Sequence, residues 1–459
     1  MRNLLNQLTL IFFGLCSTLQ AQDSLRIDQL AESFLRQTKL PGLSIAVAKE
    51  GKVIYAKGFG YADLEDGEPM IPTTRIRTAS VAKVLTATAL GRLTTEGLLD
   101  FDVPIKKYVP YINERYASLT VRQLAGHTSG LKHRPSAKGY QNKQYNTIKE
   151  TLEIINEPLL FEPGTDYKYS TAAYNLLAAV IEGVSGMSYA EYMKRWVFAP
   201  IQMKYTAPEN INKLTNGDAE IYLLKNGKLK RDKLNNGSYK VPGAAFRSTP
   251  SDLVKLMNAY SYQGLVSKEV ADDMFASNRL LNGEETNVGI AWRSSIDVFG
   301  NNVIEHAGSW RGARTVLVYY PEDLLSVSLM VNAECRLLIE ETAHIFAQFF
   351  RHDEEGASKI NLNEKVVVIH NSKEGQVQYN GNLFMNSGRG TLSVESDNFL
   401  KSNEIIQTQN GFALSTFYGL LFMEIRDTLK TNGRVYAYRT MNKRNPKEEK
   451  PLLEIRRAN

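Results

Sequence analysis

Apolar positions recur along the chain with a period that changes from segment to segment, and these changes predict the order of its elements. Residues 24–38 have helical spacing of apolar side chains, carried by Leu25, Ile27, Leu30, Phe34 and Leu35. Two apolar runs, 43–48 and 53–56, flank Glu50-Gly51-Lys52 and predict a strand, a turn and a second strand. The small and apolar residues that follow Ser80, without Gly or Pro up to Leu90, predict a buried helix with Ser80 near its start.

Helices and loops are expected through the middle of the chain. Thr120 is placed to cap a helix that ends near Gly126, and an apolar helix is expected to run to about Gly183. Strands are then predicted at 288–292, 303–306, 315–320 and 325–331, with a closing helix at 339–351. Strands at both ends with helices between them favour an α+β domain whose sheet is built from both ends.

The last hundred residues have a different pattern. Short alternating segments in residues 362–459 are separated by turns such as Asn380-Gly381, Asn410-Gly411 and Asn432-Gly433, which predict a small all-β domain without a catalytic constellation. The charged residues 353–361 are expected to be a linker. The predicted division is a signal peptide at 1–21, a main domain at 22–352, the linker, and the β domain.

The N-terminus has the features of a secretion signal. Arg2 precedes the apolar stretch 8–15, and Leu19-Gln20-Ala21 fits a cleavage site before Gln22, so we expect a secreted or periplasmic protein. Cys16 would serve as a lipid anchor only with a small residue before it, and Leu15 argues against that. The apolar stretch is short for a membrane span, and no later run is long enough for one. Cleavage would leave Cys335 as the single cysteine, which excludes an intramolecular disulfide.

Composition narrows the possible partners. The 459 residues are 43% hydrophobic and 23% charged, with a net charge of +6 and no basic block interleaved with aromatics, so nucleic-acid binding has little support. Residues 132–150 are polar and basic, and include Lys132, Arg134, Lys138, Lys143 and Lys149. This segment is interpreted as a solvated loop; if it borders a site, it would favour acidic substrates.

Ser80 and Lys83 are the first candidates for chemistry. On a helix, positions i and i+3 share a face, so the Lys83 amine comes beside the Ser80 hydroxyl. A hydroxyl is a poor nucleophile, and a nearby amine can take its proton if burial lowers the pKa of the amine. Ser-x-x-Lys also arises as a helix cap followed by a surface lysine. The apolar helix around Lys83 favours the catalytic interpretation, because an unpaired ammonium there would be costly.

Three further motifs join this pair. Tyr169-Ser170-Thr171 places a phenol at a boundary between a loop and a helix. In His306-Ala307-Gly308-Ser309, Gly308 permits close approach of a substrate, and the Ser309 N–H can face an oxyanion. His127, beside Thr-Ser-Gly, is either a base or, more commonly, a residue that fixes a turn by hydrogen bonds.

The Ser80-Lys83 pair, the Tyr169 motif and the His306 motif, in this order along the chain, resemble those of the serine β-lactamase and penicillin-binding-protein superfamily. The likeness is greatest to its class C branch, which includes D-stereospecific peptidases, esterases and mitochondrial β-lactamase-like peptidases. The resemblance covers about residues 24–350, and Leu124 to Leu131, Glu162-Pro163-Gly164 and Ser248 to Leu253 also fit it. It implies an antiparallel sheet flanked by helices plus a helical lobe. It also implies that Ser80 forms an acyl-enzyme without metal or cofactor, and that Lys83 and Tyr169 share the proton transfers, with Lys83 lowering the pKa of the phenol. The N–H groups of Ser80 and Ser309 would form the oxyanion hole.

Two departures from the family pattern bear on the substrate. Thr171 stands where this branch often has Asn, and His306 stands where β-lactamases usually have a lysine. Arg311 and Arg314 are candidates to replace that charge and bind a substrate carboxylate, unless they are surface arginines. We therefore expect a peptidase acting on D-amino-acid or cell-wall-type peptides. The alternatives are an esterase, a β-lactamase, and a non-hydrolytic penicillin-binding sensor or scaffold; the oligomeric state is left open.

Overall fold

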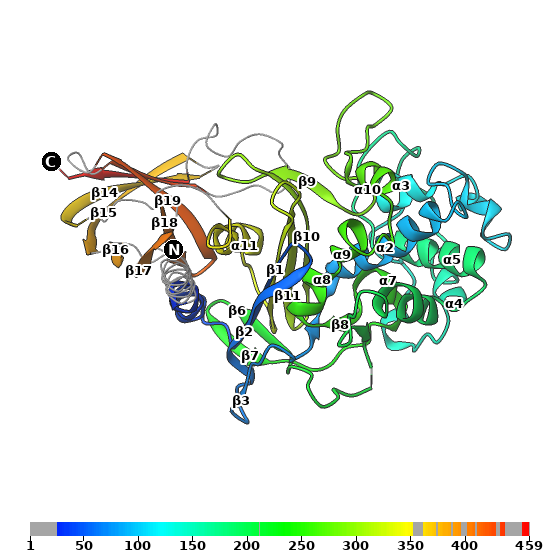
Figure 1. Ribbon diagram of the computed structural model, residues 1–459, viewed down its shortest axis with the longest axis horizontal. Coiled ribbons are helices and arrows are strands. Elements are labelled where there is room, and N and C mark those ends of the chain that lie inside the picture. The colour runs from blue at the N-terminus through cyan, green and yellow to red at the C-terminus, as the bar shows by residue number, and fades with distance from the viewer. Residues whose placement is uncertain are drawn as a thin grey trace, which may run out of the picture. The chain divides into compact units, whose positions relative to one another are not determined.

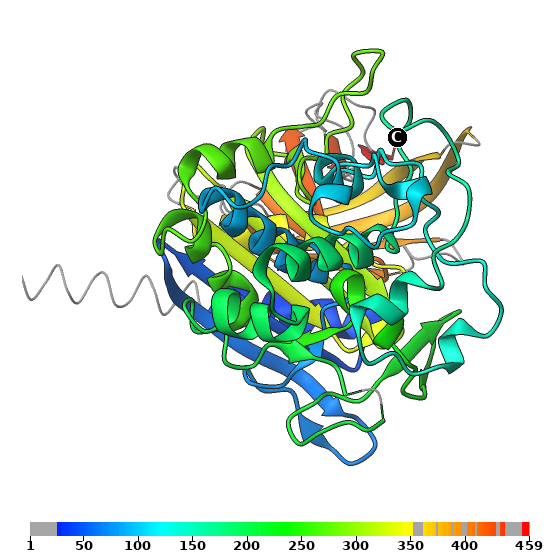
Figure 2. The same ribbon diagram turned by 90° about the vertical axis from the view of Figure 1, so that its right-hand side faces the viewer.

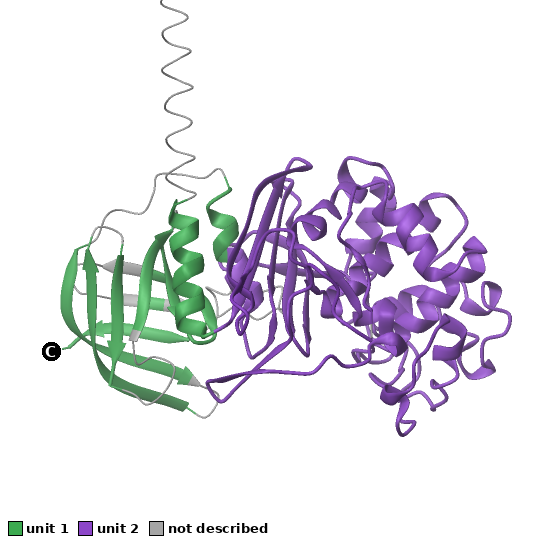
Figure 3. Ribbon diagram, turned by 90° about the horizontal axis from the view of Figure 1, so that it is seen from below, with its two compact units in different colours: residues 1–39, 345–436, 451–459 green, residues 40–344, 437–450 purple. Residues whose placement is uncertain are grey.

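The computed structural model describes residues 25–210, 212–351, 361–372, 375–386, 389–395, 402–408, 411–427, 432–436 and 452–458. The expected signal peptide, Cys16 and almost all of the expected linker lie outside these residues. The chain divides into two compact units, coloured separately in Figure 3. By contacts, residues 25–39 and 345–351 group with the C-terminal strands rather than with residues 40–344, so the domain limits derived from the sequence stay a prediction.

The larger unit is built on a seven-stranded sheet in the order β3-β2-β1-β12-β11-β10-β9, in which the neighbouring strands are antiparallel. Its strands are β1 (Gly42–Lys49), β2 (Lys52–Asp63), β3 (Glu68–Pro69), β9 (Arg293–Ile296), β10 (Asn302–Trp310), β11 (Ala313–Tyr320) and β12 (Leu325–Val331). Strand β1 pairs with β12 in a register that places Ile45 opposite Leu329. The prediction of one sheet built from both ends of the domain is confirmed (Figure 1).

One predicted strand, at 288–292, is wrong. The backbone of Asn287 and Ala291 has φ values of 57° and 70°, and the N–H of Gly289 bonds the carbonyl of Trp292. These left-handed conformations interrupt an extended chain, so the segment is a turn and β9 begins only at Arg293. The apolar side chains that suggested a strand, Ile290, Ala291 and Trp292, are instead fully buried in the core.

Helices of the larger unit lie in front of the sheet in Figure 2. The helical segments are η1 (Ala79–Val81), α2 (Ala82–Thr95), η2 (Ile105–Lys107), η3 (Glu114–Tyr116), α3 (Val121–Ala125), η4 (Tyr140–Asn142), α4 (Ile148–Leu152), α5 (Ala173–Ser185), α6 (Tyr189–Tyr192), the π-helical η5 (Met193–Phe198), η6 (Ser238–Lys240), α7 (Val241–Ala244), α8 (Pro250–Lys255), α9 (Asn258–Ser261) and α10 (Lys268–Phe275). Helix α11 (Ile339–Gln348) follows the sheet. Thr120 caps α3 in a capping box with Gln123, as predicted.

Short strands complete the larger unit. Strands β4 (Ile76–Arg77), β8 (Phe246–Ser248) and β5 (Ala207–Pro208) form one small sheet, and β6 (Tyr222–Lys225), β7 (Lys228–Arg231) and β13 (Ala333–Glu334) form another. The first of these matters for the site. It ties the segment that precedes Ser80 to the segment that follows Gly243, which lies far away in the sequence.

The smaller unit contains a closed barrel of β14 (Leu362–Ser372), β15 (Gly375–Asn386), β16 (Arg389–Val394), β17 (Ser402–Thr408), β18 (Gly411–Thr416), β19 (Gly419–Asp427), β20 (Asn432–Tyr436) and β21 (Leu453–Arg457). Strand β14 pairs with both β15 and β21, which closes it. Residues 25–38 form the predicted helix, whose Arg36 pairs with Glu404 at 2.9 Å. The all-β prediction is confirmed, whereas closure of the strands into a barrel was not predicted.

Candidate active site

Ser80 lies in the 3₁₀ turn η1, which leads directly into α2. The sequence predicted that a helix would begin near Ser80. Ala79 has a φ of 45°, an uncommon conformation for a residue with a side chain. The flanking backbone is fixed on two sides: the Thr78 N–H donates to the Phe246 carbonyl at 2.9 Å, and the Thr315 hydroxyl donates to the Thr78 carbonyl at 2.7 Å. Strands β8 and β11 therefore hold the turn that presents Ser80.

Lys83 is fully buried on the first turn of α2. Its Nζ lies 3.4 Å from Ser80 Oγ, 3.2 Å from Thr171 Oγ1 and 2.8 Å from the Gly243 carbonyl oxygen. None of these three partners is a carboxylate, so nothing among them stabilises an ammonium ion by charge. Burial, with a smaller contribution from Arg293, holds the pKa of the Lys83 amine well below its usual value.

Tyr169 precedes α5, and its ring centre lies 4.9 Å from Lys83 Nζ. Burial raises the pKa of the phenol above its usual value, while Arg293 and a hydrogen bond with Ser80 act in the opposite direction. The expectation that Lys83 would lower this pKa is wrong. Burial disfavours the phenolate more than the neighbouring groups favour it, and an amine with a strongly lowered pKa supplies little positive charge.

Two histidines flank the Tyr169 ring. The ring of His127 is centred 4.3 Å away and that of His133 is 5.5 Å away. His127 has a φ of 64°, and its Nδ1 accepts a hydrogen bond from the Ser170 N–H at 3.2 Å. Burial lowers its pKa well below the usual value, so the imidazole is neutral. These contacts fit the interpretation in which His127 fixes a turn.

Gly308 on β10 lies against the Ser80 turn. A Cβ added to Gly308 would lie 2.7 Å from the Ser80 nitrogen and 2.7 Å from the Thr78 carbonyl oxygen. Only glycine therefore permits this approach, which brings the next residue, Ser309, to the wall of the Ser80 pocket. His306 on the same strand is buried, and burial holds its pKa well below the usual value, so it supplies no charge at neutral pH.

A small pocket of about 60 Å³ opens at Ser80. It is lined by Ser80, His133, Arg134, Pro135, Thr171, Ala172, Asn175, Tyr239, Lys240, Ala244, Ser309 and Trp310. The structure thus brings together three residues expected at the site, namely Ser80, Thr171 and Ser309. Arg134, from the basic segment, also borders it, as the alternative interpretation of that segment required.

Arg311 and Arg314 do not line this pocket. Arg311 is half exposed and lies 3.7 Å from Asp232. Arg314 donates to the Leu337 carbonyl at 2.9 Å and to Glu340 at 3.0 Å. Because these groups already engage both side chains, the structure does not place either arginine as the carboxylate fork that the sequence suggested.

Two residues that line the pocket, Lys240 and Asn175, were not detected from the sequence, and neither was Arg293, which does not line it but acts electrostatically on Lys83 and Tyr169. Lys240 ends η6, directly before helix α7, and Asn175 lies in the first turn of α5. Arg293, at the start of β9, lowers the pKa of Lys83 and opposes the rise in the pKa of Tyr169, but no motif in the sequence around it indicates this effect. Their relevance depends on loops that meet only in the folded chain.

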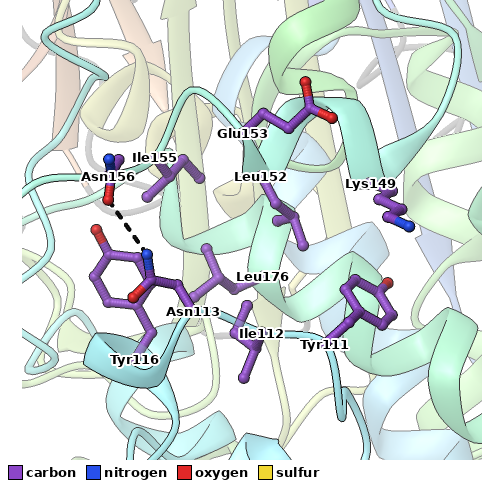
Figure 4. Close-up of a pocket in the computed structure, with 10 residues that line it drawn as sticks. All are labelled: Tyr111, Ile112, Asn113, Tyr116, Lys149, Leu152, Glu153, Ile155, Asn156 and Leu176. Atoms are coloured by element: carbon purple, nitrogen blue, oxygen red, sulfur yellow. Dashed lines mark hydrogen bonds between the residues drawn. The ribbon is translucent and has the colours of Figure 1, made fainter.

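Pocket size alone does not locate chemistry in this protein. A larger hollow of about 470 Å³, shown in Figure 4, is lined by Tyr111, Ile112, Asn113, Tyr116, Lys149, Leu152, Glu153, Ile155, Asn156 and Leu176. Asn113 bonds Asn156 across it at 3.2 Å. Its lining residues include no serine, cysteine or histidine, so it lacks the serine and amine pair that the Ser80 site presents.

The described residues also bear on metal binding and on membrane crossing. Within them, no group of three or more histidine, cysteine, aspartate and glutamate side chains is arranged to hold a metal ion. Among the same residues, no helix has both the length and the apolar character that crossing a membrane requires.

Residues 27–342 match the model of the Beta-lactamase family. The chain belongs to this family. It is 28% identical over 380 residues to the human mitochondrial serine beta-lactamase-like protein LACTB, an alignment that covers 62% of this chain and 69% of the relative. The family assignment and the Ser80 geometry identify the chain as a β-lactamase-related serine hydrolase, as the sequence motifs predicted.

Solved structures support the fold. The octameric penicillin-binding protein homologue from Pyrococcus abyssi has a TM-score of 0.58 and 21% identity, covering 95% of this chain and 100% of that chain. The D-amino acid amidase from Ochrobactrum anthropi SV3 has a TM-score of 0.59 and 22% identity, covering 68% and 92%. The predicted β-lactamase and transpeptidase-like fold is confirmed.

Proposed function

We propose that this hydrolase is a peptidase that cleaves an amide bond of short D-amino-acid-containing or cell-wall-type peptides through an acyl-enzyme on Ser80. The observation that carries the proposal is the fully buried Lys83 amine 3.4 Å from Ser80 Oγ. The lowered pKa of that amine favours its neutral form, which is the form that can accept the serine proton.

The hydrogen-bond geometry gives this base a direction. A neutral amine has two N–H donors and one lone pair. We assign one N–H to the Gly243 carbonyl at 2.8 Å, which can only accept, and the other to Thr171 Oγ1 at 3.2 Å, with the hydroxyl of Thr171 oriented as an acceptor. The lone pair is then left for the Ser80 hydroxyl, which donates its proton to Lys83 as Oγ attacks the substrate carbonyl.

The remaining proton transfer is assigned to Tyr169. The Ser80 Oγ–carbon bond forms, and the negative charge on the carbonyl oxygen is bound by the N–H groups of Ser80 and Ser309. As the carbon–nitrogen bond breaks, the leaving amine takes a proton from the Tyr169 phenol, which its raised pKa keeps protonated at neutral pH. The phenolate is reprotonated from Lys83, and water then releases the acyl group and restores Ser80.

The choice of substrate rests on two arguments. The fold is shared with a D-amino acid amidase, an enzyme named for its action on amides. His306 is neutral where a β-lactamase would hold a permanent charge, which argues against lactams as the main substrate. The expected signal peptide at 1–21 is part of this proposal and would place the activity outside the cytoplasm, where such peptides occur.

The test begins with a fluorophosphonate probe and the intact mass of the protein. We expect one adduct on the wild type, none on Ser80→Ala, and an unchanged adduct on the control Ser251→Ala, a serine on α8 outside the pocket. Hydrolysis of D-peptides, matched L-peptides, esters and a penicillin is then compared. Folded wild type that takes no adduct would favour the sensor or scaffold alternative, and adduct formation with ester but no amide turnover would favour an esterase.

A further inference from the structure

The wall of the Ser80 pocket carries two cationic side chains and no acid. Arg134 comes from the basic segment at 132–150 and Lys240 from the end of η6. None of the twelve lining residues is an aspartate or glutamate, and His133 is neutral because burial lowers its pKa to about 4. A pocket of this composition attracts an anionic group to the neighbourhood of the nucleophile.

The position of Lys240 is fixed by an aromatic side chain. Its Nζ lies 3.7 Å from the ring centre of Trp310, within cation–π distance. The Arg77 guanidinium lies 4.1 Å from the same ring. Trp310 itself belongs to β10, directly after Ser309, so the lysine is tied to the strand that borders the nucleophile.

The backbone around Lys240 is also held. Asn175 donates to the Tyr239 carbonyl at 2.8 Å, and the Tyr239 ring meets the Tyr140 ring edge-on with centres 4.8 Å apart. The Ser238 hydroxyl accepts a hydrogen bond from the Tyr145 N–H at 3.0 Å. These contacts come from two separate segments, α5 and the 132–150 segment, so the backbone of residues 238–240 is held in place from outside its own loop.

The charge on this wall is uncompensated within the pocket. Glu209 is the acid that acts on Lys240, but it already lies 2.7 Å from Arg77 and 3.2 Å from Arg247. Burial, together with Lys83, Arg134 and Arg77, lowers the pKa of Lys240 to about 7. A bound anion would raise the pKa of Lys240, because an opposite charge at close range favours the ammonium form.

We propose that Lys240 and Arg134 bind a carboxylate of the substrate while Ser80 attacks, which makes the hydrolase selective for peptides with a free carboxylate close to the scissile bond. This inference rests on the proposed peptidase function. The sequence suggested Arg311 and Arg314 as the residues that bind the substrate carboxylate. The proposal assigns this role instead to Lys240 and Arg134, which belong to two other segments. A terminal carboxylate and an acidic side chain present the same chemistry, and the test separates them.

The test compares matched substrates that differ in one charge. D-Ala-D-Ala and its C-terminal amide report a terminal carboxylate, D-Ala-D-Glu amide and D-Ala-D-Gln amide report a side-chain carboxylate, and succinyl- and acetyl-D-Ala p-nitroanilide report one on the acyl side. We expect wild type to prefer one anionic partner by about 10- to 100-fold in kcat/KM. Lys240→Gln should abolish that preference through KM, with a much larger loss for the anionic partner than for the neutral one, whereas Lys240→Arg retains it.

Lys138→Gln is the matched control, since it removes the same charge from the exposed part of the basic segment and should keep the preference. Equal turnover of both partners in all three pairs by wild type overturns the inference, as does equal loss of both in Lys240→Gln.

Labelling of Ser80 by a neutral fluorophosphonate separates this result from failure of the peptidase proposal. If labelling occurs without any amide turnover, slowing of labelling by glutarate but not by glutaramide still reports the carboxylate site, and Lys240→Gln should remove that difference. Equal slowing by both compounds counts against the site.

Discussion

The hydroxyl of Thr171 lies 3.2 Å from the amine of Lys83. Apart from Ser80, it is the side-chain group within hydrogen-bond distance of this amine. The other acceptor is the backbone carbonyl of Gly243, which a side-chain substitution at position 243 would not remove. Thr171 also lines the pocket beside Ser80. The position that often holds asparagine in this branch therefore has a definite task toward the lysine in this chain.

Replacing Thr171 by valine tests that task. Thr171→Val keeps the shape but removes the acceptor, which frees one N–H of Lys83 and lets the amine rotate away from Ser80. We expect the rate of Ser80 acylation to fall by about tenfold, as loss of one hydrogen bond of about 1–1.5 kcal/mol implies.

Thr171→Asn restores an acceptor and should recover most of the rate, with binding of a substrate amide as an added effect on KM. Stopped-flow labelling with a fluorophosphonate measures the acylation step. A Thr171→Val enzyme that acylates at the wild-type rate would show that the Gly243 carbonyl alone aligns the lysine.

Tyr169→Phe should affect amides far more than activated esters. The phenol has a raised pKa and is proposed to protonate the leaving group. An amine must be protonated to leave, whereas p-nitrophenolate leaves without help. We expect a loss of about 10²- to 10⁴-fold in kcat for a D-peptide p-nitroanilide and a smaller loss for a p-nitrophenyl ester of the same acyl group. Equal losses for both substrates would instead assign Tyr169 to activation of Ser80.

The pair formed by Ser80 and Lys83 could be predicted because its geometry is local. Three residues of helical or 3₁₀ spacing bring the two side chains to one face, and the surrounding apolar sequence indicates burial. The pKa of Tyr169 could not be predicted in the same way. Its direction depends on how completely α5, β10 and the loop at 127–133 exclude water from the phenol, which is a property of tertiary packing.

The fold shows the same division. Strands at both ends of the domain were predicted to share a sheet, and β1 pairs with β12 as expected. The strand predicted at 288–292 failed because apolar residues in a buried turn have the same composition as a strand. Lys240 and Arg134 lie about a hundred residues apart in the sequence, and no periodic pattern links them. The sequence therefore indicated the basic segment that contains Arg134 but not Lys240.

The pH dependence of kcat/KM should differ between neutral and anionic substrates. In the proposed mechanism Lys83 acts as a neutral base, so activity should rise with pH through its pKa, which lies well below the usual value near 10.5. For a neutral amide we expect a plateau that extends to alkaline pH, because the raised pKa of Tyr169 keeps the phenol protonated and able to protonate the leaving amine. For an anionic partner, activity should fall as pH rises through about 7, where free Lys240 loses its proton.

Pre-steady-state or kcat/KM profiles between pH 5 and 10 measure both limbs. In Lys240→Gln the descending limb for the anionic substrate should disappear, while the ascending limb stays in place. An ascending limb centred near pH 10 would contradict the role of Lys83 as a neutral base, because an exposed lysine would give that value.

Glu209 should be important for stability. It is fully buried between Arg77 and Arg247, at 2.7 Å and 3.2 Å, and Arg77 in turn packs on Trp310. Glu209→Gln leaves two buried guanidinium groups without their common counterion, and we expect a loss of about 3–5 kcal/mol in the free energy of unfolding. Glu114→Gln is the control: Glu114 is 81% exposed in its pair with Lys106, so its loss should be about 0–1 kcal/mol. Urea unfolding of both variants measures the difference, and equal effects would contradict this account.

Gly308→Ala should separate strand β10 from the nucleophile. The added methyl group would lie 2.7 Å from two backbone atoms, the Ser80 nitrogen and the Thr78 carbonyl oxygen, and 2.5 Å from Thr315 Oγ1. Backbone atoms cannot swing aside as a side chain can, so β10 must move and carry the Ser309 N–H away from the oxyanion. We expect kcat to fall by about 10²- to 10³-fold, as for loss of one oxyanion donor, with a loss of about 1–3 kcal/mol in stability.

Gly67→Ala provides the matched control for this substitution. A Cβ at Gly67 meets open space, but its φ of 71° makes alanine unfavourable there, so the variant should also lose stability. Since Gly67 is remote from the Ser80 pocket lining, its kcat should stay near that of wild type. Thermal unfolding and turnover of one neutral ester, measured on both variants, distinguish a specific effect on the oxyanion hole from general destabilisation. Comparable kcat values in the two variants would remove the support for a role of the Ser309 N–H.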